Sequence, residues 1–162
     1  MSKRKNTIPR ISILSGGIGP EREVSLNSGL ALADALEGYS LIDLIDLKNT
    51  ALPTELDPGK QVIFPVIHGT FGEDGTLQKM LEEAGFAYAG CDSSSSRLCM
   101  HKGLCKDRVR SKDVRIVPDY RFQDPREVSP DSIIRELGQE LIVKPADQGS
   151  SVALHVCSGV EE

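Results

Sequence analysis

The sequence is poor in aromatic residues and in clustered positive charge. Only 4% of its 162 residues are aromatic, none is tryptophan, and the formal net charge is -5. Nucleic acids and anionic membranes bind basic patches, and single-stranded nucleic acids also stack on aromatic rings, so this composition argues against both partners. The only short basic run is Lys3-Arg4-Lys5. A small molecule is therefore the favoured partner.

Long apolar runs and metal-type cysteine pairs are also missing. No stretch reaches the roughly 20 apolar residues of a membrane span, and the basic start leads into Asn6-Thr7-Ile8-Pro9 rather than an apolar signal core. We therefore expect a cytoplasmic protein with no membrane partner. The cysteines form no Cys-x-x-Cys pair and lack a matching histidine spacing, which favours reduced thiols over a zinc site or disulfides. They are Cys91, Cys99, Cys105 and Cys157.

Short apolar runs alternate with a helical pattern in the first ninety or so residues. The expected strands lie at 11–14, 39–47, 61–67 and 86–89. A glycine-rich turn at 15–20 leads into a helix at 21–36, on which Val24, Leu32 and Leu36 share one face. This order predicts an open parallel α/β sheet with ligands at the carboxyl ends of its strands.

Two polar residues follow expected strand ends. Glu21 lies at a helix start, where the dipole favours a carboxylate, and His68 opens a glycine-rich loop, where an imidazole can donate to an oxyanion. An ordinary helix-end charge and an ordinary loop histidine are the alternatives. A dinucleotide-binding module is another alternative, with Asp43 or Asp46 as the ribose acid, but Arg22 stands at its third glycine position.

A change in composition divides the chain. The four serines at 93–96 predict a polar loop between two domains, which we place at 1–95 and 96–162. Ser96 is expected to cap a helix that reaches about Arg110. A second helix is expected at 130–137.

The stretch 141–156 predicts a strand, a loop and a second strand. Pro145 should end the first strand near Lys144, and the amides and hydroxyls of Ser150 and Ser151 offer donors to an anion such as phosphate. The spacing is not that of a Walker A loop, because a strand rather than a helix is expected to follow. A hairpin with a solvated lysine is the alternative.

Four motifs, in this order, resemble those of D-alanine:D-alanine ligase, an ATP-grasp enzyme. They are Gly16-Gly17-x-x-x-Glu21-Arg22-Glu23-Val24-Ser25-Leu26, His68-Gly69-x-x-Gly72-Glu73-Asp74-Gly75, Met100-x-Lys102 and Val143-Lys144-Pro145-x-x-x-Gly149-Ser150-Ser151. The resemblance implies a Rossmann-like pre-ATP-grasp domain with an open parallel sheet, followed by a truncated ATP-grasp α+β subdomain. His101 departs from the family, which usually has aspartate there, and Ala153 stands where glycine is common.

The resemblance implies formation of D-alanyl-D-alanine for peptidoglycan through an acyl phosphate at the expense of ATP. Glu21 would hold the ammonium of the first D-alanine and His68 would steady negative charge on its acyl group, with Glu21 and Ser150 forming a catalytic network. The residues expected at ATP are Lys102, Lys144, Ser150 and Ser151.

The family continues far beyond Glu162, and that part carries its Mg2+ ligands. The resemblance therefore implies ATP with Mg2+, no metal site within this chain, and no activity of the chain alone. Glu73 and Asp74 are expected to play a structural part in their loop. A homodimer is possible by family, and a non-catalytic ligand-binding relative is the alternative function.

Overall fold

The computed structural model describes residues 10–149 and 151–159, and the chain divides into two compact units between Arg97 and Leu98. The first unit contains β1 (Arg10–Gly16), α1 (Arg22–Ala35), β2 (Ile42–Leu47), β3 (Gln61–Pro65), α2 (Thr76–Glu83) and β4 (Ala87–Tyr88). Helix α3 (Ser93–Met100) spans the division. Among the described residues, no helix is both long and apolar enough to cross a membrane.

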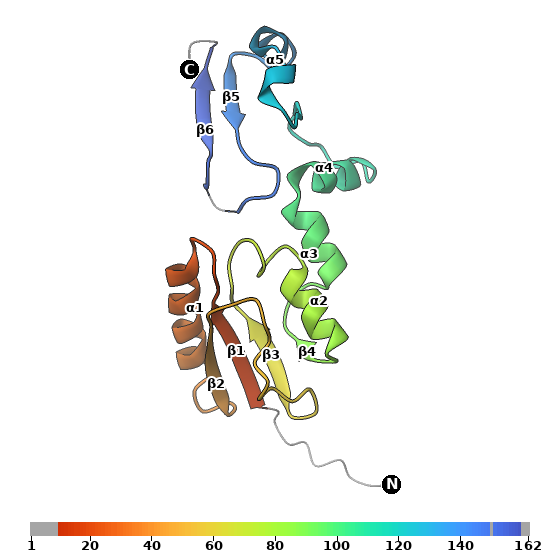
Figure 1. The fold of residues 1–162 in the computed structure, drawn as a ribbon. Coiled ribbons are helices and arrows are strands. Elements are labelled where there is room, and N and C mark those ends of the chain that lie inside the picture. Colours follow the sequence, from red (N-terminus) through yellow and green to blue (C-terminus); the bar gives the residue numbers. More distant parts are fainter. Residues whose placement is uncertain (1–9, 150, 160–162) are drawn as a thin grey trace. The chain divides into compact units, whose positions relative to one another are not determined.

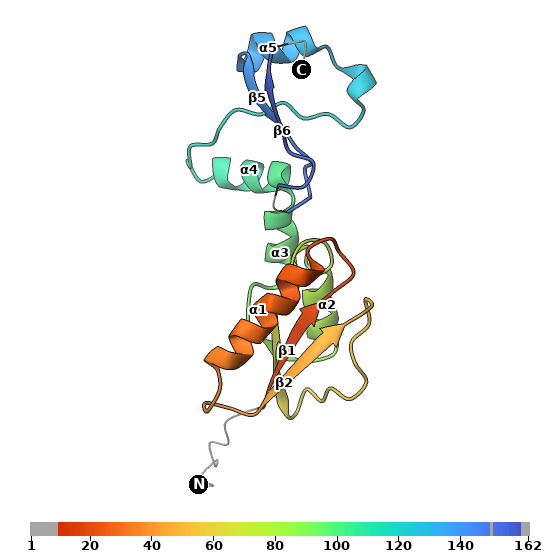
Figure 2. The same ribbon diagram turned by 90° about the vertical axis from the view of Figure 1, so that its left-hand side faces the viewer.

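The first unit is a parallel sheet in the order β2-β1-β3-β4 (Figure 1). Helices α1 and α2 lie on opposite faces of this sheet (Figures 1 and 2). The predicted open parallel α/β sheet is confirmed. Pro65 ends β3 opposite Leu14, and β4 stops two residues short of it, so no neighbouring strand requires the amide that proline lacks.

The hydrophobic core lies entirely within the first unit. The apolar run of β1 supplies Ile13 and Leu14, and the helical spacing of α2 supplies Leu77 and Leu81, all fully buried. The remaining buried apolar side chains are Leu47, Ile63, Ile67, Phe71 and Phe86. This core fixes the strand ends from which the candidate site is built.

The inner face of α1 differs from the predicted one. Val24 is 56% exposed, and the buried residues of the helix are Ser25 and Gly29. A Cβ at Gly29 would lie 2.8 Å from the Cβ of Ser15, so the helix backbone packs closely against β1. Leu32 and Leu36 are half-buried on the side of Ser25 and Gly29, so apolar periodicity misplaced Val24 alone, where small residues make the contact.

The serine run is helical, which corrects both the expected loop and the expected cap at Ser96. The Asp92 carboxylate accepts from the Ser95 amide at 2.7 Å, as an N-cap does. Glu82 accepts from the amide and hydroxyl of Ser93 and from the Tyr88 hydroxyl. Burial and the Glu82 hydrogen bond raise the pKa of Tyr88 to about 12. These carboxylates convert a sequence that is typical of loops into the first turn of α3.

The second unit is built of short elements. They are α4 (Lys102–Arg110), a 3-10 turn (Pro125–Glu127), α5 (Pro130–Leu137), β5 (Glu140–Val143) and β6 (His155–Ser158). The expected single helix ending near Arg110 is two helices, because His101 has an extended backbone between α3 and α4. Strand β6 begins later than predicted, since residues 151–153 form a turn in which Ala153 has a φ of +49°.

The two strands of this unit pair antiparallel, with Ile142 opposite Val156 (Figure 1). These two side chains are 60% and 71% exposed. No hydrophobic side chain among the described residues after Arg97 is buried. Apolar burial therefore contributes little to holding these elements together.

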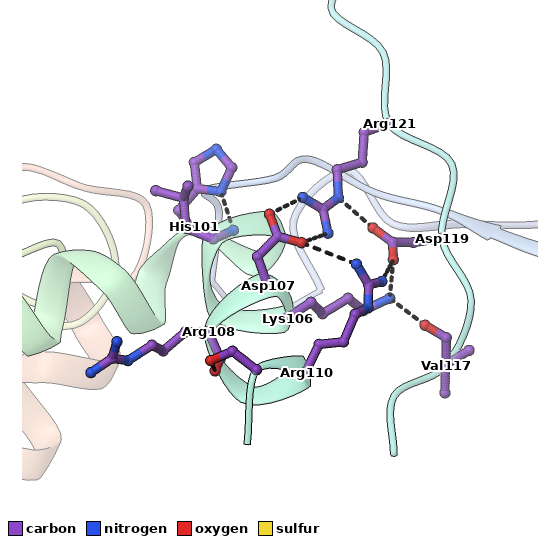
Figure 3. Close-up of polar contacts among 10 residues, drawn as sticks. His101, Lys106, Asp107, Arg108, Arg110, Val117, Asp119 and Arg121 are labelled. Atoms are coloured by element: carbon purple, nitrogen blue, oxygen red, sulfur yellow. Dashed lines mark hydrogen bonds and ion pairs between the residues drawn. The ribbon is translucent and has the colours of Figure 1, made fainter. Parts of the chain in front are cut away.

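Ion pairs and hydrogen bonds connect α4 to the extended segment that follows it, which includes residues 117–121 (Figure 3). The Arg121 guanidinium donates to both carboxylate oxygens of Asp107, at 2.7 and 2.8 Å, and to Asp119. Lys106 Nζ donates a hydrogen bond to the carbonyl of Val117 at 2.9 Å. The hydrogen bonds from Arg121 lower the pKa of Asp107 and of Asp119, so both carboxylates stay charged at neutral pH.

Candidate functional site

The glycine turn after β1 is held by Arg22 of α1. Gly16 and Gly17 have φ values of +84° and +90°, which side chains other than glycine rarely adopt. Arg22 donates to the Gly17 carbonyl at 3.1 Å and pairs with Asp46 at the end of β2, at 2.7 Å. The hydrogen bond from Arg22 lowers the pKa of Asp46.

These contacts give a structural role to the residues of the dinucleotide alternative. Asp46 is engaged by Arg22, and Asp43 is engaged by Arg10 at 2.9 Å and by Gln61. Each carboxylate is therefore already paired with an arginine. The arginine at the third glycine position thus has a structural role, namely fixing the turn to β2.

A buried serine near the start of α1 is hydrogen-bonded to the end of β1 and to the residue that follows β3. Ser25 Oγ accepts from the Gly16 amide at 2.8 Å and donates to the Val66 carbonyl at 2.7 Å. The Ser25 side chain is fully buried, and its bond with the Gly16 amide is protected from water. Ser25 was part of the quoted motif, but nothing in its spacing marked it as the residue that links β1, α1 and the end of β3.

Glu21 extends its carboxylate toward the loop after β3. It occupies the N-cap position of α1 but makes no side-chain cap hydrogen bond. Its Oε2 lies 2.8 Å from the position that a Cβ on Gly69 would occupy, and Gly69 has a φ of +72°. No hydrogen-bonding partner of the carboxylate occurs among residues 10–149 and 151–159. The charge is therefore available to a cation or an ammonium group.

His68 is positioned from both of its ring nitrogens. Nε2 lies 3.2 Å from Ser28 Oγ on α1, and Nδ1 lies 3.5 Å from Glu73 Oε1. Glu73 also accepts from the Gly69 amide at 2.9 Å. Glu21, Gly69 and His68 are thus brought together at the carboxyl edge of the sheet. Sequence reasoning did not single out Ser28, because only the pairing of α1 with this loop brings it near the ring.

Asp74 shapes the same loop. It accepts from the Phe71 and Thr76 amides, both at 2.9 Å. Burial alone would raise the pKa of Asp74, but these backbone hydrogen bonds outweigh it and lower the pKa. These hydrogen bonds of Asp74, and the bond that Glu73 accepts from the Gly69 amide, give both acidic residues a structural role in the loop, as expected.

The two lysines expected at ATP lie in the second unit, one at the start of α4 and the other directly after β5. The Lys102 amide donates to the Ala146 carbonyl at 2.8 Å, and its Nζ donates to the Gln148 carbonyl at 2.6 Å. Lys144 is exposed at the end of β5, and Ser151 lies in the turn before β6. Ser150 lies outside the described residues.

The described residues offer no group of three or more histidine, cysteine, aspartate or glutamate side chains that could hold a metal ion. Magnesium prefers several oxygen ligands in a near-octahedral arrangement.

A sequence model described as "D-ala D-ala ligase N-terminus" matches residues 45–91. The D-alanine--D-alanine ligase of Thermotoga petrophila is 41% identical over 158 residues, which are 94% of this chain and 49% of that protein. Over nearly its whole length the chain is thus similar to the amino-terminal half of D-alanine--D-alanine ligases.

Further relatives and solved structures agree. The D-alanine--D-alanine ligase of Glaesserella parasuis is 35% identical, with 94% of this chain and 51% of that protein covered. The Bacillus anthracis D-alanine--D-alanine ligase complexed with ATP has a TM-score of 0.80 and 28% identity, covering 94% of this chain and 51% of that one. The structure of the Coxiella burnetii D-alanine-D-alanine ligase has a TM-score of 0.80 and 27% identity, and the match covers 93% of this chain and 56% of that one. The chain thus spans about half the length of the curated relatives it matches.

Proposed function

We infer that the chain supplies the first D-alanine site, and part of the ATP site, of a D-alanine:D-alanine ligase that works in the cytoplasm. The observation that carries this proposal is the Glu21 carboxylate, which has no hydrogen-bonding partner among the described residues and lies against Gly69 in the loop of His68. A carboxylate in this position suits an amino acid as ligand, because the ammonium group of an amino acid needs an anionic partner.

In this proposal, the carboxylate of the first D-alanine attacks the γ-phosphorus of ATP, which yields an acyl phosphate and ADP. The amine of the second D-alanine then attacks the acyl carbon, and phosphate leaves as the peptide bond forms. Glu21 binds the first ammonium group, and His68, held by Ser28 and Glu73, stabilises negative charge on the acyl oxygen. Lys102, Lys144 and the serines of the following loop bind ATP phosphates.

Magnesium would neutralise phosphate oxygens in this reaction. By the resemblance its ligands lie in the half of the relatives that this chain does not match, so we assign none of them to this chain. Glu21, His68 and the two lysines act by binding and by electrostatic stabilisation only.

Glu21→Gln tests the amino-acid site in a complete ligase that carries this segment. The KM for the first D-alanine should rise ~10- to 150-fold, because a charge-assisted hydrogen bond contributes about 1.5–3 kcal/mol. Steady-state kinetics at saturating ATP measure this value, and the KM for ATP should stay nearly constant. Glu23→Gln, an exposed change in the first turn of the same helix, is the matched control. An unaltered D-alanine KM in Glu21→Gln would remove Glu21 from the site.

Lys144→Ala tests the nucleotide site in the same protein. It should weaken ATP binding by a factor of ten or more, on the order of one charge-assisted bond, and Lys144→Arg should restore little because a planar guanidinium does not replace a compact ammonium. Lys102→Ala should act in the same direction. Calorimetric titration of ATP measures each affinity, with exposed Lys112→Ala as control. Wild-type affinity in Lys144→Ala would mean that this lysine is merely solvated.

A further inference from the structure

One buried hydroxyl connects the two elements that carry the candidate amino-acid site. Ser25 lies near the start of α1, and its amide donates to the Glu21 carbonyl at 3.0 Å, so these residues belong to one helical turn. Ser25 Oγ accepts from the Gly16 amide at 2.8 Å and donates to the Val66 carbonyl at 2.7 Å. A hydroxyl can donate one hydrogen bond and accept another at the same time, which suits serine to this double role.

The two backbone groups that Ser25 binds lie next to the two loops of the candidate site. Gly16 is the last residue of β1 and opens the turn that leads to Glu21. Val66 directly follows β3, and His68 comes two residues later. The path from Glu21 to His68 through Ser25 therefore consists of one helical hydrogen bond, one side-chain hydrogen bond and two residues of chain.

Close packing on the next turn of α1 leaves the helix no room to move toward the sheet. A Cβ on Gly29 would lie 2.8 Å from Ser15 Cβ in β1 and 3.0 Å from Leu44 Cδ1 in β2. Ser25 and Gly29 are both buried and lie four residues apart, on the same face of the helix. The helix is thus already in contact with the sheet at Gly29, and the bonds of Ser25 hold its amino end.

Loss of the Ser25 hydroxyl would remove the acceptor of the buried Gly16 amide and a donor to the Val66 carbonyl. An unsatisfied buried amide is costly, so the amino end of α1 would shift or admit water. A second described contact between α1 and the loop, from Ser28 Oγ to His68 Nε2, spans 3.2 Å. It is longer than either bond of Ser25 and is therefore the weaker constraint on the start of the helix.

We propose that Ser25 is a positioning residue for the first amino-acid site, whose hydroxyl fixes Glu21 and His68 at the separation that the substrate requires. The inference rests on the proposed function, since it takes Glu21 to bind the ammonium group and His68 to act at the acyl group of the same amino acid. These two groups are attached to one carbon of the substrate, so the ligand cannot follow a shift of one partner. A misplacement of about 1 Å can cost about 100-fold in rate.

Ser12 provides a matched control for the removal of the Ser25 hydroxyl. Ser12 is also fully buried, and it lies in β1 four residues before Gly16, away from the carboxyl edge of the sheet. Its hydroxyl also has two described hydrogen bonds, one from Gln61 Nε2 at 2.9 Å and one to Asp43 at 3.4 Å. S12A and S25A therefore remove the same chemical group from equally buried places in one unit.

NMR of the purified 162-residue chain tests the positioning without any substrate. S25A should lower the hydrogen-exchange protection of the Gly16 amide about ten-fold and shift the ring resonances of His68, whereas S12A should leave both near their wild-type values. S25C retains a weaker donor and acceptor, so it should give intermediate values, and it replaces S25A if that variant does not fold. His68 resonances that are unchanged in the folded variant would overturn the inference.

Steady-state kinetics of a complete ligase that carries this segment test the link to the substrate. S25A should raise the KM for the first D-alanine about ten-fold and leave the KM for ATP unchanged, because it misplaces the amino-acid site alone. A merely structural role would lower kcat through the loss of folded enzyme and leave both KM values constant, as expected for S12A.

A double-mutant cycle separates this inference from the proposed function. In the E21Q background, S25A should raise the D-alanine KM by about two-fold at most, because the charged partner that Ser25 positions is already lost. A wild-type KM in S25A, or a ten-fold increase in both backgrounds, would overturn the positioning role. An unaltered KM in E21Q alone would instead refute the proposed function, and this inference with it.

Discussion

Replacing Gly72 with alanine should lower the free energy of unfolding of the first unit by about 3 kcal/mol, the upper end of overpacking costs. A Cβ at this position would lie 2.1 Å from the carbonyl oxygen of Ile67, which is backbone and cannot rotate away. The Gly72 carbonyl also accepts a hydrogen bond from Nε2 of the buried Gln78 side chain at 2.7 Å, so a shift of the loop would break a hydrogen bond that is protected from water. Urea unfolding followed by circular dichroism measures the change.

Gly19→Ala is the matched control for this change. Gly19 lies in the other loop of the candidate site, its φ is not positive, and no atom lies within 4 Å of the position of its Cβ. Its effect should stay within about 0.5 kcal/mol, as for exposed substitutions. Equal urea midpoints for the two variants would show that the loop of Gly72 can relax at no cost.

A polypeptide of only these 162 residues should release no phosphate from ATP in response to D-alanine. Phosphoryl transfer requires a metal ion that neutralises the phosphate oxygens, and the resemblance implies that the ligands of this ion lie outside the half of the relatives that this chain matches. The chain also spans only about half of its curated relatives, such as the Thermotoga petrophila ligase. A coupled phosphate assay with and without D-alanine measures this.

The positive control for that assay is a complete relative at the same concentration. The chain should give the rate of the ATP-only blank. D-alanine-dependent release at the relative's rate would require metal ligands within this chain and would contradict the assignment of magnesium to other residues.

The sequence predicted the parallel unit well, because its signals are local. The apolar run at 11–14 and the glycine turn at 15–20 correspond to the observed β1 and to the turn at Gly16 and Gly17. On α1 the placement of Val24 was wrong, because this residue fits apolar periodicity but is exposed, whereas Ser25 and Gly29 are buried. Close packing between small residues leaves no hydrophobic pattern to read.

The elements after Tyr88 were less predictable, because distant or unusual partners define them. The serine run forms a helical turn only because Glu82, eleven residues before Ser93, accepts from its amide and hydroxyl. The break between α3 and α4 depends on the imidazole of His101, which helix-capping rules do not favour. At the candidate site, the motifs identified Glu21 and His68, but the partner Ser28 emerged only from the fold.

The confinement of the core to the first unit has a calorimetric consequence. The positive heat-capacity change of unfolding comes from apolar surface that becomes hydrated, and every buried apolar side chain among the described residues lies between Ile13 and Phe86. The ion-paired elements around Arg121 have little such surface to expose. Heating the chain should therefore give an endotherm whose heat-capacity step reflects the first unit, and which is smaller than a uniformly packed protein of 162 residues would give.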